Sequence, residues 1–375
     1  MKITRIKYDY IIVGSGITGL ALAVAALEHG CSVLLLEKDS RAFGASTQHT
    51  GLVAPVLEPS GPRLRRAMYT RDKWLELADP AGYWTSGTGV AIPAYHRSEM
   101  AVLEAHHATG LYQTTLLTAK KMAEKYPQLN SNGLVGGMVS DAEITLDSGK
   151  AVYAIANWLR TQEGCDLHCN ELVVHAETGK VHTLDGVYEA EEVLICNGND
   201  ACTLFPEVFS QLALRTVKMQ MIRTQPAAAF SLGPAWLNTL ALSHYEPFPM
   251  YAAYREMAEY HATVYPEREK HGIHLILTQN REGELTLGGS METGPGLDPF
   301  NRQDINQLIV GAARRVLKPA TGPVKYVWNG MFTETADRSE LVVSPCKGVT
   351  LVNGFGRDAL TTCFGFARDF LQVYR

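Results

Sequence analysis

Two continuous apolar runs near the start of the chain indicate buried strands. Residues 8–13 read YDYIIV and residues 32–37 read SVLLLE. Runs without polar alternation are typical of strands that are covered on both faces of a parallel sheet. The segment between them is rich in alanine and leucine and reaches Gly30, and glycine commonly ends a helix. The start of the chain therefore predicts one βαβ unit.

The turn between the first strand and the helix carries the pattern G-x-G-x-x-G at residues 14–19. Gly14 permits a tight turn, Gly16 lets a pyrophosphate approach the backbone, and Gly19 allows the helix to pack closely on the strand. Glu37 ends the second strand, where it is placed to accept hydrogen bonds from ribose hydroxyls. The free N–H groups of the helix start favour phosphate. This unit predicts a dinucleotide site, and taken alone it suits NAD as well as FAD.

The rest of the chain alternates between helical and strand-like patterns. A helix is predicted over 150–162 and a buried strand over 192–196. Alternating runs at 214–223, 273–278 and 284–288 predict an antiparallel sheet with attached helices. A strand over 349–352 leads through a glycine-rich turn into a helix that reaches about residue 373. Nucleotide-binding elements at both ends and in the centre are thus interrupted twice by a second kind of structure.

Composition and charge exclude several classes of protein. The formal net charge is −5, from 34 basic and 39 acidic residues, which does not suit a nucleic-acid binder. Seven scattered cysteines predict reduced thiols and a cytoplasmic location, and Cys165, His168 and Cys169 lack the second pair that a zinc site needs. The apolar stretch 10–27 contains three glycines and no cleavage site, so neither a signal peptide nor a membrane span is predicted.

Five segments in order resemble the D-amino-acid oxidase family of flavoenzymes, which includes glycine oxidase and sarcosine oxidase. They are YDYIIVGSGITGL with LLLEKD, GASTQHTGLVAP (44–55), VLICNGND (193–200), GELTLGGSMETG (283–294) and VNGFGRDALTTCFGFA (352–367). The resemblance covers essentially the whole chain. Segments 133–147, 215–226, 240–248 and 272–302 are similar to a bacterial subgroup found in phosphonate-metabolism gene neighbourhoods.

The resemblance implies an α/β fold with a Rossmann-like FAD-binding domain, of the glutathione-reductase type, interleaved with a mixed or antiparallel-sheet substrate domain. Residues 1–85, 149–212 and 322–375 are expected to form the FAD-binding domain. Residues 86–148 and 213–321 are expected to form the substrate domain. The cofactor is expected to be non-covalent FAD, because Gly330 stands where covalently flavinylated sarcosine oxidases carry a cysteine.

The family also implies which positions hold FAD. Val173 is expected to meet the adenine through its backbone, and the helix after Leu360 to direct its N-terminus at the pyrimidine edge of the flavin, where reduction places negative charge. The expected cofactor residues are Gly14, Gly16, Ile17, Thr18, Gly19, Glu37, Lys38, Ala45, Ser46, Thr47, Gly51, Val173, Gly198, Gly354, Gly356, Arg357, Leu360 and Thr361.

The expected reaction is the oxidation of a small amine that bears an acidic group. Hydride passes from the carbon next to nitrogen to flavin N5, and water hydrolyses the imine. Because the flavin carries this chemistry, no catalytic base is assigned. A planar guanidinium suits either carboxylate or phosphonate, so Arg357 is the leading substrate residue. Further substrate candidates are His49, Lys218, His244, Tyr245, Tyr251 and Arg338.

Substrate and acceptor stay open at this level. An aminophosphonate such as 2-aminoethylphosphonate or its N-methyl derivative is favoured, and glycine or sarcosine is the alternative. A flavin-binding electron-transfer protein without amine chemistry is a further alternative. A nicotinamide enzyme has no evident use for residues 354–361. Sarcosine oxidases carry an oxygen-activating lysine where this chain has Thr286, so the acceptor is dioxygen or another carrier.

Overall fold

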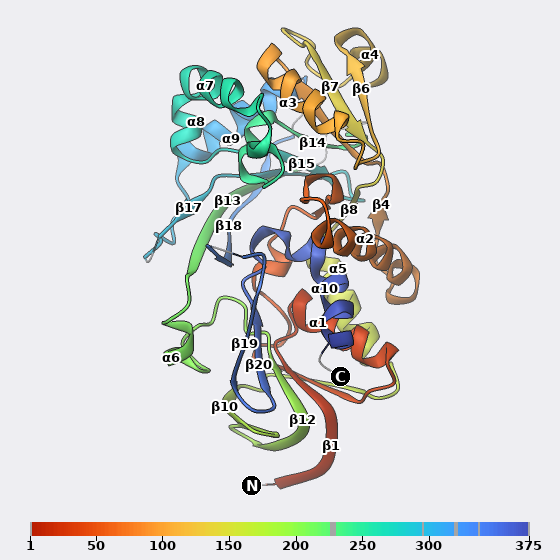
Figure 1. The fold of residues 1–375 in the computed structure, drawn as a ribbon, viewed down its shortest axis with the longest axis vertical. Helices are drawn as coiled ribbons and strands as arrows, with labels where there is room; N and C mark the ends of the chain where they lie inside the picture. The colour runs from red at the N-terminus through yellow and green to blue at the C-terminus, as the bar shows by residue number, and fades with distance from the viewer. Residues whose placement is uncertain (1, 226–229, 295, 319–321, 337, 374–375) are drawn as a thin grey trace.

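The computed structural model describes residues 2–225, 230–294, 296–318, 322–336 and 338–373, with only the backbone of residues 2–6. The molecule is elongated, with one sheet at each end of its long axis and helices packed between and around them (Figure 1). Both chain ends lie in the half of the molecule that contains the first strand (Figure 1).

Within the described residues, the first sheet has eight strands around a parallel centre. Strand β1 pairs in parallel with β2 and β12, β2 with β9, and β12 with β20, whereas β10–β11–β12 and β19–β20 are antiparallel. The strands are β1 (Lys2–Val13), β2 (Val33–Glu37), β9 (Cys165–Cys169), β10 (Val173–Glu177), β11 (Lys180–Thr183), β12 (Gly186–Ile195), β19 (Leu341–Cys346) and β20 (Val349–Asn353).

Both faces of this sheet are buried, as its apolar runs predict. Ile12 and Leu35 pack against helices on one face, and Ile11 and Leu34 pack into a separate cluster on the other. Trp74 is fully buried in the helical layer. The helices of this layer are α1 (Ile17–Glu28), α2 (Pro62–Ala81), α5 (Ser148–Leu159) and α10 (Ala359–Val373).

In the part of the chain that the structure describes, the second sheet has nine strands and is antiparallel except where β14 pairs in parallel with β5. Its strands are β5 (Val90–Ala94), β6 (Thr114–Thr118), β7 (Gly136–Ser140), β13 (Leu214–Thr224), β14 (Ala235–Leu237), β15 (Ile276–Gln279), β16 (Leu285–Gly288), β17 (Glu292–Thr293) and β18 (Val324–Thr335). Near it lie α3 (Arg97–Ala108), α4 (Ala119–Lys125), α7 (Tyr254–Val264), α8 (Pro266–Lys270) and α9 (Gln303–Val316).

Short elements connect the two sheets. A small sheet of β3 (Leu52–Val53), β8 (Ile144–Leu146) and β4 (Thr85–Ser86) lies between them, and α6 (Pro206–Phe209) precedes β13. The 3-10 turns are η1 (Ala45–Thr47), η2 (Pro55–Leu57), η3 (Thr239–His244), η4 (Phe248–Met250) and η5 (Gly356–Asp358). Of these, η1 and η5 become part of the candidate site described below.

The sheets divide the chain at a different place from the predicted domain boundary at residue 322. Strand β18 pairs with β13 from Val324 to Thr335, so it belongs to the second sheet. Its mixed polar and apolar residues match a half-exposed antiparallel strand. The second sheet therefore extends beyond residue 322, and the division into two domains stays a prediction. Within the described part of the chain, every helix is too short or too polar to cross a bilayer.

Candidate functional site

A cavity of about 370 Å³ opens at the carboxyl ends of β1, β2 and β12. This edge is where the switch in strand order of a parallel sheet leaves a crevice for ligands. Among the predicted cofactor positions, those lining the cavity are Gly14, Gly16, Glu37, Lys38, Ala45, Ser46, Val173 and Gly198. The structure thus brings together residues from five separate parts of the chain.

The glycine turn fits its predicted role sterically. Gly14 has φ +105°, and a Cβ there would lie 2.4 Å from the Cys196 carbonyl oxygen. A Cβ on Gly19 would lie 2.0 Å from the Gly14 carbonyl oxygen, so the helix packs on the strand only if this residue is glycine. The Ser46 hydroxyl accepts a hydrogen bond from the Ile17 N–H at 3.0 Å, which places η1 over the start of α1. Thr18 follows in the same first helical turn.

Glu37, at the end of β2, stabilises the glycine turn of residues 14–19 through hydrogen bonds. One carboxylate oxygen accepts hydrogen bonds from the Ser15 N–H (2.9 Å) and hydroxyl (2.7 Å), and the other accepts one from the Asp39 N–H (3.1 Å). The side chain is buried. The oxygen that accepts both Ser15 hydrogen bonds uses its two lone pairs, and the oxygen that accepts the Asp39 N–H retains one for a ribose hydroxyl. Lys38 lies at the rim of the cavity and pairs with Asp200 at 3.6 Å.

A second and smaller cavity, which we call the ring cavity, lies between η1, β13, β18 and η5. It has a volume of about 30 Å³ and meets the first cavity at Ala45. Met219, Met221 and Phe332 give it apolar walls, and His49, Tyr245, His274 and Arg357 give it polar ones. Gly51 and Gly354 both have positive φ, and a Cβ on Gly51 would meet the Leu146 carbonyl oxygen at 1.9 Å. The two cavities together suit an extended cofactor.

His49 joins the two loops that form the ring cavity. Its Nδ1 accepts a hydrogen bond from the Gly51 N–H at 3.1 Å, so the proton lies on Nε2, which donates to the Arg357 carbonyl at 3.1 Å. Burial lowers the pKa of His49 to about 4, and the ring is therefore neutral at pH 7. The imidazole acts as a fixed spacer between residues 49–51 and η5.

Arg357 places a positive charge in the wall of the ring cavity. Its guanidinium is mostly buried, lies 3.4 Å from the Met291 sulfur and makes a long ion pair of 3.6 Å with Glu334. The other oxygen of Glu334 is closer to Arg215, at 2.8 Å. Among the described residues, no carboxylate lies within hydrogen-bonding distance of the Arg357 guanidinium. The Arg357 guanidinium is therefore available to an anionic group of a ligand.

Neutral rings surround that charge. Burial lowers the pKa of His274 to about 4 and that of His244 to about 2, and repulsion from Arg357 acts in the same direction. The Arg357 guanidinium lies 5.9 Å from the centre of the Tyr245 ring, and burial raises the pKa of this phenol above its usual range. Arg357 is thus the one group lining the ring cavity, among the described residues, that is charged at pH 7.

The other predicted substrate residues lie farther from this cavity. Lys218 is on the face of β13 opposite Met219; its ammonium donates to the Asp298 carbonyl at 2.6 Å and pairs with Glu292 at 2.8 Å. The Tyr251 hydroxyl contacts His106 Nδ1 at 2.8 Å. Arg338 lines a neighbouring cavity of about 150 Å³, together with Arg357 and the predicted residues His244, Tyr245, Gly354 and Gly356.

The remaining predicted cofactor positions lie in the segments that connect and support the two cavities. The Asn353 amide donates to the Gly198 carbonyl at 2.7 Å, which ties the turn after β12 to the end of β20. Leu360 and Thr361 are buried in the first turn of α10, and the Thr361 hydroxyl accepts a hydrogen bond from the Ala54 N–H at 3.3 Å. The Thr47 hydroxyl donates to the Gly44 carbonyl at 3.0 Å and closes η1.

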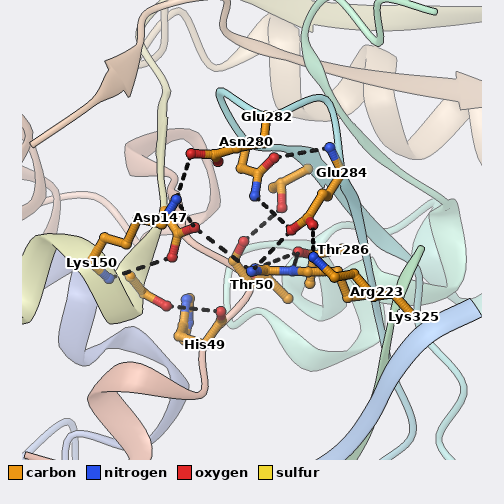
Figure 2. A network of polar contacts seen from close by, with 12 residues as sticks. His49, Thr50, Asp147, Lys150, Arg223, Asn280, Glu282, Glu284, Thr286 and Lys325 are labelled. Carbon is orange, nitrogen blue, oxygen red and sulfur yellow. Dashed lines mark hydrogen bonds and ion pairs between the residues drawn. The ribbon is translucent and has the colours of Figure 1, made fainter. Parts of the chain in front are cut away.

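Sequence reasoning missed a cation beside Thr286. Arg223 lies directly across the strand pair from Thr286, and its Nε and Nη2 donate to the Thr286 hydroxyl at 3.2 and 3.0 Å. Figure 2 shows the guanidinium between Asp147 and Glu284, with ion pairs of 3.7 and 3.8 Å. Sequence spacing contains no signal for this contact, because it depends on the register of β13 against β16.

Comparisons with known proteins agree with this geometry. The family model described as "FAD dependent oxidoreductase" (DAO) matches residues 9–372. Glycine oxidase from Geobacillus kaustophilus is 24% identical over 234 residues, which cover 58% of this chain and 61% of the relative. Its crystal structure superimposes with a TM-score of 0.78 at 19% identity, covering 98% of this chain and 95% of the other.

Two further relatives match at similar identity. The bifunctional protein ThiO/ThiG of Trichormus variabilis is 23% identical over 370 residues, covering 94% of this chain and 50% of the relative. N-methyl-L-tryptophan oxidase of Citrobacter koseri is 26% identical over 218 residues, covering 54% of this chain and 56% of the relative. The chain spans about half the length of the bifunctional relatives.

These matches confirm the predicted fold class and the predicted FAD cofactor. The glycine turn, Glu37 and the paired cavities are the parts of this structure that fit such a cofactor. The chain belongs to the DAO family of FAD-dependent oxidoreductases.

Proposed function

We propose that the protein oxidises a small amine that carries an acidic group, and that an aminophosphonate such as 2-aminoethylphosphonate or its N-methyl derivative is the favoured substrate. The observation that carries this proposal is the mostly buried Arg357 guanidinium, which lines the ring cavity and whose one ion pair among the described residues is a 3.6 Å contact with Glu334. A buried cation without close partners is costly, and an anionic ligand removes that cost.

FAD, when bound, supplies the acceptor for a hydride from the carbon next to the amine nitrogen. Residues 14–19, Glu37 and Val173 hold its nucleotide part, and residues 45–51 with 354–361 frame its ring. The protein's own contribution is positioning. Arg357 fixes the acid group through two N–H donors, while Met219, Met221 and Phe332 exclude water from the other walls.

The same cation favours the reactive form of the amine. A free alkylamine has a pKa near that of lysine, about 10.4, so it is mostly protonated at pH 7. Burial and a nearby positive charge both lower an amine pKa. Arg357 provides the charge and the apolar walls provide the burial, so the bound nitrogen retains its lone pair without a dedicated base. His49, His244 and His274 are neutral, so none of them is an imidazolium that would protonate the amine.

A glycine- or sarcosine-type amino-acid oxidase is the second candidate. The fold is similar to that of glycine oxidase. A carboxylate and a phosphonate both match a guanidinium fork, so the contacts of Arg357 suit either acid. The relative rates of the two kinds of amine therefore decide between them.

The test is anaerobic reduction of the enzyme-bound flavin by each amine, monitored as the loss of flavin absorbance. N-methyl-2-aminoethylphosphonate and 2-aminoethylphosphonate should bleach the flavin faster than glycine or sarcosine. The reverse order would assign the protein to the amino-acid class. If none of these amines or their homologues bleached the flavin, the electron-transfer alternative would replace both candidates.

A second arm tests the role of Arg357. Arg357→Met should raise KM for acidic amines by about 10- to 100-fold, which corresponds to the loss of a charge-assisted hydrogen bond. KM for uncharged N-methylethylamine should change less than about threefold, within ordinary context effects. Arg255→Met, at an exposed arginine on α7, is the matched control. Equal effects on both amine classes would contradict the assigned contact.

A further inference from the structure

A third cavity, of about 630 Å³, lies on the other side of residues 47–49 from the ring cavity. It is bounded by the loop after β2, the first turns of α5, and strands β13 and β18. Gln48 and His49 line both cavities, whereas Arg357 lines only the ring cavity of the two. A molecule in this third cavity would therefore lie against Gln48 and His49, which also line the ring cavity, but away from Arg357 and the proposed amine site.

The charge in this cavity is mainly positive. Arg41, Lys150 and Arg223 line it, and Asp147 is the one carboxylate among its described lining residues. Arg41 is exposed, and no carboxylate among the described residues forms an ion pair with it. The first turn of α5 also faces the cavity at Gly149, and a helix start favours negative charge.

Acidic neighbours offset part of the charge of Lys150 and Arg223. Lys150 pairs with Glu282 at 2.6 Å, and Arg223 makes ion pairs of 3.7 and 3.8 Å with Asp147 and Glu284 (Figure 2). These contacts hold Lys150 and Arg223 in place. Arg41, by contrast, contacts the Phe43 and Tyr153 rings and forms no ion pair with a carboxylate in the described part of the chain, so its charge is available to a ligand.

Aromatic rings occupy the remaining walls. Phe43, Tyr153 and Tyr326 are 49%, 46% and 56% exposed and surround the opening of the cavity. The Arg41 guanidinium lies 5.0 Å from the Phe43 ring centre and 5.5 Å from that of Tyr153. Deeper in, the Trp328 indole donates to the Gln48 carbonyl at 3.2 Å. Exposed large aromatic side chains gathered around one hollow mark a binding site.

We propose that this third cavity binds a planar, negatively charged aromatic molecule of the quinone type, which accepts the electrons that the amine delivers to the cofactor. Flat rings suit the aromatic walls, and an acidic substituent suits Arg41. Two electrons and one proton leave the reduced cofactor, and with one proton from solvent they convert the quinone into its hydroquinone. The inference rests on the FAD cofactor and not on the identity of the amine.

The binding test uses oxidised holoenzyme and 1,4-naphthoquinone-2-sulfonate in equilibrium dialysis. Arg41→Glu should raise Kd at least tenfold, and Tyr153→Ala should raise it about threefold. Arg255→Glu, a charge reversal at an exposed arginine on α7, is the matched control and should leave Kd unchanged. Neutral 1,4-naphthoquinone should respond to Tyr153→Ala but little to Arg41→Glu.

The electron-transfer test uses holoenzyme reduced with one equivalent of dithionite, so its outcome does not depend on the amine. Mixing with the sulfonated quinone under anaerobic conditions should reoxidise the flavin, at least fivefold more slowly in Arg41→Glu than in Arg255→Glu. Tyr326→Ala on β18 repeats the test from the opposite wall if Arg41→Glu loses FAD. Absence of saturable binding, or equal rates in the Arg41 and Arg255 variants, would overturn the proposal.

Discussion

The first cavity and the ring cavity lie in one molecule but are built in different ways. The first is formed at the ends of parallel strands by a backbone turn, and its key carboxylate, Glu37, comes from the neighbouring strand. The ring cavity is assembled from β13, β18, η1 and η5, which are far apart in the chain. Backbone geometry determines the first cavity, whereas side chains brought together by tertiary contacts determine the second.

Electrostatics separate the two regions further. In the first cavity, backbone N–H groups and a hydroxyl satisfy the Glu37 carboxylate at distances of 2.7 to 3.1 Å. In the ring cavity, Arg357 has a 3.6 Å ion pair and neutral histidines around it. The first region is complete before a ligand arrives, and the second is completed by one. Loss of cofactor should therefore follow changes in the first region, and altered substrate discrimination should follow changes in the second.

The largest effect is expected from Gly19→Ala. The added Cβ would lie 2.0 Å from the Gly14 carbonyl oxygen, so α1 must move away from β1. The variant should lose most of its bound flavin, with a destabilisation of about 3 kcal/mol or more from the steric conflict. The measurements are the ratio of flavin absorbance to protein absorbance and the midpoint of thermal unfolding.

Gly87→Ala is the matched control for that change. Nothing lies within 4 Å of a Cβ at Gly87, and the residue lies between β4 and β5, outside the glycine turn. Its flavin content should equal that of the unmodified protein. Full flavin content in Gly19→Ala would show that the turn tolerates a side chain, and the contrast between the two regions would fail.

The next effect is a dependence of stability on pH that originates in the ring cavity. Burial lowers the pKa of His274 to about 4, below its usual 6.5. As pH falls from about 6.5 to about 4, the unfolded chain takes up a proton at this residue while the folded chain does not, so stability decreases over that window. The loss attributable to His274 is at most about 3 kcal/mol.

His274→Asn keeps a donor for the Gly272 carbonyl, which His274 Nδ1 contacts at 3.0 Å, but it cannot be protonated. Its free energy of unfolding, measured with urea at pH 7, 5.5 and 4.5, should decrease less steeply than that of the unmodified protein. His175→Asn, at an exposed position on β10, is the control and should keep the original slope. Identical slopes in all three proteins would show that His274 does not control the acid response.

The same contrast explains how much the sequence predicts. The pattern at 14–19 and the acid at Glu37 lie within one βαβ unit, so local spacing is enough to predict their geometry. Arg357 is predicted as a residue, but Glu334 and Met291 reach it through β18 and the segment after β16, which no local pattern connects. Lys218 lies on the opposite face of β13 from the ring cavity, because side chains alternate along a strand.

Position 286 shows most directly what local sequence patterns do not predict. The resemblance implies that Thr286 stands where sarcosine oxidases carry a lysine, and on that basis alone the position lacks a cation. The register of β13 against β16 places Arg223 opposite Thr286, so a guanidinium occupies the neighbourhood after all. Pairing register is set by contacts along the whole sheet, which is why a single chain position does not reveal it.

The smallest and sharpest prediction applies one substitution to both regions. Glu37→Gln removes the charge that accepts the Ser15 and Asp39 donors, and Glu334→Gln removes the charge between Arg215 and Arg357. Glu37→Gln should weaken FAD binding by about tenfold, about 1.4 kcal/mol, and leave KM for the amine nearly unchanged. Glu334→Gln should leave FAD affinity unchanged and shift KM for acidic amines severalfold. Its kcat should stay nearly constant, because the change alters the position of the Arg357 guanidinium and not the reacting atoms.

Flavin titration of the apoprotein and steady-state kinetics measure the two constants separately. If both variants changed both constants to the same degree, the cofactor and amine regions would be one coupled unit rather than two.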